Sequence, residues 1–136
     1  MPPNLTRIAV MKGEKGPTFK GGITVTLPIR TESEANMREC WQAKHRRSSA
    51  QRLVVARGLY NHKTQLRAHR GRFYVTLTRI GVRDLDGDNL QRSFKAIRDQ
   101  VAEMCGVDDG SDRIGFHYRQ ERGKPKEYAV RVEIRQ

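Results

Sequence analysis

The sequence predicts a single α+β domain, in which a small mixed β-sheet of about four strands packs with two main helices in the order β-α-β-α-β-β. Length is the first observation, because 136 residues are enough for one domain and too few for two of ordinary size. Composition is the second, since 36% apolar and 31% charged residues fit a small core under a heavily charged surface. Periodicity is the third: four segments alternate apolar and polar residues, and two longer stretches are helical in composition. We therefore treat residues 1–136 as one domain.

The chain is expected to begin with a loose arm and a strand. Residues 1–21 are rich in Pro, Gly and Lys and show no periodicity, which is typical of an irregular segment. Ile23, Val25 and Leu27 then alternate with threonines and are followed by Pro28. This pattern predicts a half-buried strand that ends at the proline.

A long basic helix is predicted over residues 33–59, because no Pro or Gly interrupts the stretch before Gly58. Its broken apolar stripe consists of Met37, Trp41, Leu53 and Val54. Residues 60–71 are polar and are expected to form a loop.

The C-terminal half predicts a strand, a helix and two more strands. Alternation over residues 73–78 predicts the second strand. The cleanest amphipathic helix runs from about 89 to 105, because five apolar residues recur at spacings of 4, 3, 4 and 3, and Gly106 is a typical C-terminal stop. These residues are Leu90, Phe94, Ile97, Val101 and Met104. Alternation over 114–118 and 128–134 predicts two strands, joined by a hairpin through 121–125.

The charge of the chain predicts a polyanionic partner. It contains 27 Lys and Arg against 15 Asp and Glu, a net charge of +12. Residues 33–72 alone hold ten Lys or Arg and two Glu, a net of +8. We therefore expect binding to nucleic acid through phosphates. The predicted DNA-binding residues are Arg46, Arg47, Lys63, Arg67, Arg70, Arg83 and Arg92.

The sequence lacks a secretory or membrane-spanning pattern, so a cytosolic protein without membrane association is expected. Cys40 and Cys105 form no metal-binding motif and are expected to be reduced.

An acidic cluster interrupts this basic chain. Residues 84–112 hold eight Asp or Glu and three Lys or Arg, a net of −5. Clustered carboxylates repel each other and repel phosphate unless a cation lies between them. Asp86 and Asp88 are two apart in a segment expected to be extended, which directs both side chains to one side and suits Mg²⁺ or Mn²⁺. The alternative is structural: Asp88 or Asn89 caps the following helix, although capping explains one aspartate and not several.

Two further patterns bear on this cluster. Residues 84–95 resemble the start of an EF-hand loop, but Asn89 replaces its glycine and Lys95 its final glutamate, which excludes that motif. Spacings of 4, 3 and 4 on the predicted helix indicate one polar stripe, formed by Asp88, Arg92, Lys95 and Asp99. This stripe is either an exposed face with ion pairs or a source of a cation beside the metal.

Together these residues resemble the RusA family of Holliday junction resolvases, in particular its phage and prophage members. The resemblance rests on three motifs in order: Asp86-Gly87-Asp88-Asn89, then Lys95-Ala96-Ile97-Arg98-Asp99, then Asp108-Asp109. It covers about residues 73–134, and the N-terminal half matches only as a strand followed by a basic helix.

The resemblance implies a homodimeric, Mg²⁺-dependent endonuclease that cleaves four-way DNA junctions in a bacterial cytoplasm and needs no small-molecule cofactor. It implies that Asp86, Asp88 and Asp109 are the catalytic, metal-binding carboxylates and Lys95 the catalytic lysine. Arg92 stands at the usual place of that lysine and remains the alternative.

Helix geometry adds an expectation about assembly. A straight helix over 89–105 is roughly 25 Å long, so Asp109 cannot easily reach Asp88 of its own chain. A two-fold dimer with antiparallel helices brings them together, which predicts shared active sites. The competing functions are a non-catalytic nucleic-acid-binding protein, a nuclease for flaps, forks or duplex, and an inactive relative.

Overall fold

The computed structural model describes residues 22–31 and 40–136. Its elements are β1 (Ile23–Leu27), α1 (Trp41–Leu59), the 3₁₀ turn η2 (Tyr60–His62), α2 (Lys63–Ala68), β2 (Phe73–Gly81), α3 (Gly87–Ser93), α4 (Lys95–Cys105), β3 (Ile114–Arg122) and β4 (Ala129–Arg135). The predicted arm at 1–21 and the predicted beginning of the first helix at 33–39, including Met37, lie outside the described residues.

The four strands form one mixed sheet in the order β1-β4-β2-β3. β4 pairs antiparallel with both β1 and β2, whereas β2 and β3 are parallel. A parallel pair needs a crossover connection, and α3 and α4 provide it. The predicted class, a four-stranded mixed sheet packed with helices, is therefore confirmed.

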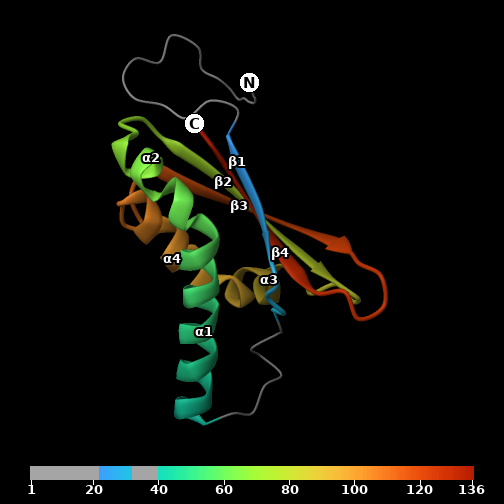
Figure 1. Cartoon of the computed structure of the whole chain (residues 1–136). Coiled ribbons are helices and arrows are strands. Elements are labelled where there is room, and N and C mark those ends of the chain that lie inside the picture. The colour runs from blue at the N-terminus through green and yellow to red at the C-terminus, as the bar shows by residue number, and fades with distance from the viewer. Residues whose placement is uncertain (1–21, 32–39) are drawn as a thin grey trace.

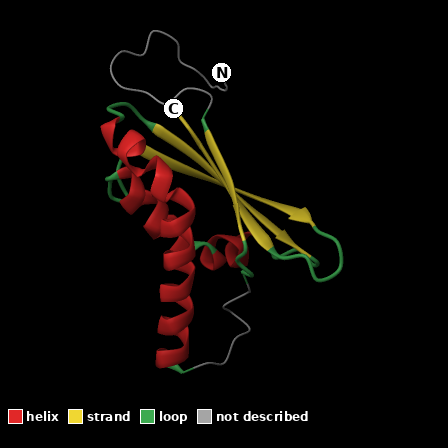
Figure 2. Cartoon of the chain, in the orientation of Figure 1, coloured by secondary structure: helices red, strands yellow, loops and turns green. Residues whose placement is uncertain are grey.

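The register of the sheet separates an apolar face from a polar one. One row across the sheet joins Ile23, Ile134, Val75 and Phe116. The adjacent row joins Thr24, Glu133, Thr76 and His117. Because successive residues of a strand point to opposite faces, the first row faces the core and the second faces away from it. Figures 1 and 2 show α1, α2 and α4 together on one side of the sheet.

The two long helices contribute very differently to the core. α4 buries seven of its eleven residues, whereas α1 buries only Gln51, Val55 and Leu59 of its nineteen. The predicted apolar stripe of this helix is wrong for Trp41 and Leu53, which are 73% and 50% exposed. Solvent, rather than the core, therefore surrounds most of the Trp41 side chain and half of the Leu53 side chain.

The predicted hairpin between the last two strands is also wrong. β3 and β4 lie on opposite sides of β2, so the segment between them passes the end of β2. Gly123 N donates to the carbonyl oxygen of Gly81 at 2.9 Å. A Cβ at Gly123 would lie 3.0 Å from Ile80 Cγ2, so a larger residue would fit at this crossing only if its neighbours shifted.

The predicted single helix over 89–105 is two helices, with a break at Phe94. The ring of Phe94 is fully buried and stacks on Tyr118 with 5.7 Å between ring centroids. Ser93 Oγ donates to the Leu90 carbonyl at 2.7 Å, a contact that commonly bends helices. The segment at 60–71, predicted as a loop, contains η2 and α2, because Leu66 is buried in the core.

Both cysteines are free, with Cys40 exposed and Cys105 buried. Among the described helices, none is both long enough and apolar enough to span a membrane.

Candidate functional site

The beginning of α3 holds the first pair of predicted site aspartates. Asp86 is the N-cap residue, and its Oδ1 accepts a hydrogen bond of 3.0 Å from the backbone N–H of Asn89. Asp88 lies in the first helical turn, where the positive end of the helix dipole favours a negative side chain. Both side chains are exposed. Capping by Asp86 and the favourable helix dipole at Asp88 therefore both stabilise the beginning of α3.

This arrangement corrects the predicted local geometry. The two aspartates were expected in one extended segment, but only Asp86 has extended backbone angles, and Asp88 is already helical. The cap is Asp86, and neither Asp88 nor Asn89. Helix capping thus explains an aspartate at position 86, and the cap hydrogen bond uses its Oδ1. Among the described residues, no hydrogen bond or ion pair involves the Asp88 carboxylate.

The second acidic group follows α4. Gly106 ends the helix in the left-handed conformation with φ 78°, as its position predicts. Asp108 accepts a backbone hydrogen bond from Ser111 in the turn beyond. The chain turns back at this point, which directs Asp109 toward the middle of α4. Asp109 Oδ2 lies 3.4 Å from Arg98 Nη2.

Arg98 is fixed from several sides. Its Nη1 donates to the hydroxyl of Tyr118 at 3.1 Å, and its guanidinium lies 5.9 Å from the ring centre of Phe116. The hydrogen bond with Tyr118 raises the pKa of Arg98 against the effect of burial, and Asp109 and Asp99 raise it further. Arg98 therefore stays charged and holds Asp109 in place. It was missed as a site residue because its role depends on a contact eleven positions along the chain.

An open cleft of about 650 Å³ lies beside this loop. Its charged lining consists of Asp99, Glu103, Asp108, Asp109, Arg67 and Arg113. Neither Asp86 nor Asp88 lines it. The predicted carboxylates thus form two groups, one at the start of α3 and one along this cleft.

The predicted metal-binding triad is not gathered within one chain. Across residues 22–31 and 40–136, no three His, Cys, Asp or Glu side chains form a group suited to a metal ion. Their chemistry nevertheless suits Mg²⁺, which prefers carboxylate oxygens and keeps several waters. The estimate of a straight 25 Å helix is wrong, since the helix breaks at Phe94. That two protomers complete each site stays a prediction.

The predicted catalytic cations occupy different helices. Arg92 is in the last turn of α3, whereas Lys95 begins α4, so the break divides the predicted polar stripe. Lys95 Nζ pairs with Asp99 Oδ2 at 3.3 Å. Both Arg92 and Lys95 are exposed. Within the predicted stripe, Lys95 and Asp99 therefore form an ion pair on α4. Arg92 lies on a different helix, α3.

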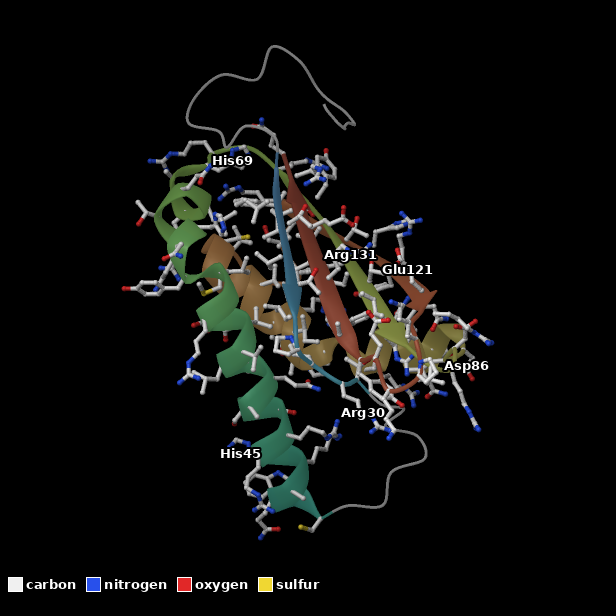
Figure 3. All side chains as sticks on the ribbon, turned by 45° about the vertical axis from the view of Figure 1, so that its right-hand side comes forward. Arg30, His45, His69, Asp86, Glu121 and Arg131 are labelled. Carbon is white, nitrogen blue, oxygen red and sulfur yellow. The ribbon has the colours of Figure 1, made fainter. Side chains whose placement is uncertain are left out.

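The predicted DNA-binding residues are spread over several elements. α1 carries Arg46 and Arg47, α2 carries Lys63 and Arg67, and the loops beside β2 carry Arg70 and Arg83. All are exposed except the half-buried Arg47. Arg67 also has a structural contact, because its Nη2 donates to the Glu103 carbonyl at 2.7 Å. Figure 3 shows Asp86 at the side of the molecule away from α1.

α1 carries an exposed aromatic pair that sequence patterns missed. Trp41 and His45 stack with 5.3 Å between ring centroids and 8° between ring planes. A helical spacing of four and two aromatic rings were the available signal. Trp41 had been assigned to the core instead.

No protein-family model and no curated protein matches this chain. The resemblance to the RusA family therefore rests on the three motifs quoted above.

Proposed function

We propose that this chain is a metal-dependent endodeoxyribonuclease that cleaves branched DNA, with four-way junctions as its substrate class. The observation that carries the proposal is the solvent-exposed carboxylate pair at the start of α3 in a chain of net charge +12. A phosphate-seeking surface loses affinity from such a pair unless a divalent cation joins carboxylate and phosphate. The resemblance of the motifs to RusA-type resolvases supports the same reading.

In this proposal, different residues bind the metal, position Asp109 and contact the DNA. A bound Mg²⁺ would activate water and offset charge on the scissile phosphate. Asp88 and the free Oδ2 of Asp86 offer it oxygen ligands on one helix end. Arg98 holds Asp109 as a further ligand or as the group that orients water. Lys95 or Arg92 contacts the phosphate, and the basic residues of α1 and α2 track the DNA arms.

The test is incubation of the purified protein with a labelled four-way junction and Mg²⁺ or Mn²⁺. We expect cleavage by the parent protein and none by Asp88→Asn, with junction binding retained or tightened because a repelling charge is lost. Asp112→Asn is the matched control, since Asp112 is an exposed aspartate of the same region outside the three motifs. If the parent protein binds junctions but leaves all branched and linear DNA intact, the chain is a non-catalytic binding protein.

Mixing two inactive variants tests whether sites are shared between protomers. In a shared arrangement, a heterodimer of Asp88→Asn with Asp109→Asn keeps one intact site, made from Asp88 of one chain and Asp109 of the other. We therefore expect nicking activity to return when the two variants are mixed and re-equilibrated. Sites built within single chains give no recovery, because each chain of the mixture then lacks one carboxylate.

A further inference from the structure

The first half of α1, residues 41–50, is a helical segment without a buried residue, which we call the α1 prong. None of its residues is buried, and the buried residues of α1 begin at Gln51. Figure 1 shows this half of α1 extending beyond the sheet and the other helices, and Figure 3 shows the same from another side. Core packing therefore does not explain the sequence of the prong.

The prong is basic and has no acidic residue. Its charged residues are Lys44, Arg46 and Arg47, with no Asp or Glu anywhere in α1. The first helical turn also carries the positive end of the helix dipole. A polyanion complements this segment. A second copy of the chain does not, because pairing two prongs brings like charges together.

The prong also presents an exposed aromatic pair. Trp41 is 73% exposed, although large apolar side chains are usually covered. Its indole ring lies nearly parallel to the His45 imidazole, four residues further along the same helix face. Exposed aromatic rings beside cationic side chains are the combination that binds single-stranded nucleic acid, where bases stack on rings and phosphates meet Lys or Arg. Duplex DNA does not offer such base faces, because its bases are stacked on each other.

We propose that the α1 prong binds unpaired nucleotides of DNA, with a base stacked on Trp41 and an adjoining phosphate contacted by Arg46. The inference rests on the proposed function in taking DNA as the ligand. It narrows the substrate class to branched DNA with unpaired nucleotides at or near the branch. Figure 3 shows His45 on α1 and Asp86 at the side of the molecule away from α1, so a branched DNA that contacts both has to span the molecule.

Trp41 is the only tryptophan of the chain, so fluorescence excited at wavelengths where the four tyrosines do not absorb reports on it alone. The probe is a thymidine oligonucleotide, titrated into the full-length protein without divalent metal so that no cleavage occurs. A duplex of equal length is the comparison. We expect saturable quenching by the single strand and little quenching by the duplex, because only the single strand places a base on the indole.

Variants test the same contact independently of fluorescence. Trp41→Ala is expected to weaken binding of a labelled single strand by about 5- to 100-fold, and binding of the duplex by less than about 2-fold. Trp41→Phe should restore most of the loss because it keeps a stacking ring. Tyr60→Ala is the matched control, since Tyr60 is 71% exposed at the other end of α1, and it should change neither affinity.

Three outcomes overturn the inference: no quenching at saturation, equal quenching by duplex and single strand, or equal single-strand affinity of Trp41→Ala and the parent protein. A fourth is a dimer that Trp41→Ala converts to monomer in sedimentation, because the prong is then a protein interface. These results are distinct from failure of the proposed function, which is read from cleavage of junctions in Mg²⁺. If the protein cleaves no DNA but single strands quench Trp41 fluorescence, the proposed nuclease activity is wrong and the inference about the prong stands.

Discussion

α4 and α1 lie on the same side of one sheet, yet they obey different constraints. α4 carries an apolar stripe and buries most of its residues, whereas the first half of α1 buries none. The two helices meet where Arg52 of α1 donates to Gln100 and Glu103 of α4, and beyond that contact α1 runs free of the core. The difference teaches that packing explains the apolar residues of α4, whereas it does not explain the basic and aromatic residues of the prong, for which we propose a nucleic-acid ligand.

The largest expected effect compares one aromatic residue from each helix region. Phe94→Ala should lower the free energy of unfolding by about 3–5 kcal/mol, because a fully buried ring leaves a cavity. Trp41→Ala should change it by less than about 0.5 kcal/mol, since the indole is mostly in water. Urea unfolding followed by circular dichroism measures both. A large loss in Trp41→Ala would show that the prong is part of the core after all.

The buried cysteine of α4 should make the stability of the fold depend on pH. Burial raises the pKa of Cys105 from 9.0 to about 12, against the lowering effects of Arg113 and Arg67. A thiol whose pKa is higher in the folded state stabilises the fold fully below pH 9, and that contribution is lost as pH rises from 9 toward 12. We expect about 2 kcal/mol of loss by about pH 10.5.

This loss should be absent from Cys105→Ala at matched pH, which separates it from other titrating groups. Thiol labelling gives a second reading: exposed Cys40, immediately before the prong, should react in the native protein, and buried Cys105 only on unfolding. Equal labelling rates of the two thiols would contradict the burial of α4.

The end of α4 offers a smaller test. Gly106→Ala should cost about 1–2 kcal/mol, because φ 78° disfavours a side chain and the new Cβ would approach Arg67 Cγ at 3.3 Å. Gly110→Ala is the control, since a Cβ there meets nothing within 4 Å. Thermal unfolding of the two variants should differ accordingly, and equal midpoints would argue against the left-handed end of α4.

The smallest expected change in stability comes from the exposed pair at the start of α4. Lys95→Ala should alter the free energy of unfolding by less than about 0.5 kcal/mol, because an exposed ion pair contributes little and a cation at a helix N-terminus is unfavourable. Measuring DNA cleavage by the variants then shows which of Lys95 and Arg92 is the catalytic cation of the proposed nuclease. The residue whose replacement by Ala abolishes cleavage while junction binding remains is the catalytic one, and Arg92→Ala is tested beside Lys95→Ala.

Sequence patterns were sufficient wherever the cause of structure is local. Alternation identified all four strands, because a strand between water and a core alternates by geometry. The apolar stripe of α4 and the end of this helix at Gly106 were also predicted from the sequence. For the candidate site, sequence identified aspartates at the start of α3 and after α4, because a surplus of acid in a basic chain is visible without coordinates.

By itself, then, the sequence determined which segments become strands, where α4 ends, and that acidic residues gather in a basic protein. Tertiary structure alone decided that β3 pairs with β2 in parallel, because a strand pattern specifies a buried face and never a neighbour. It decided the break at Phe94, where burial against Tyr118 outweighs helix continuity. It also decided that Trp41 lies in water, since exposure depends on what else covers a residue, and the other helices and strands of the described residues end before they reach this end of α1.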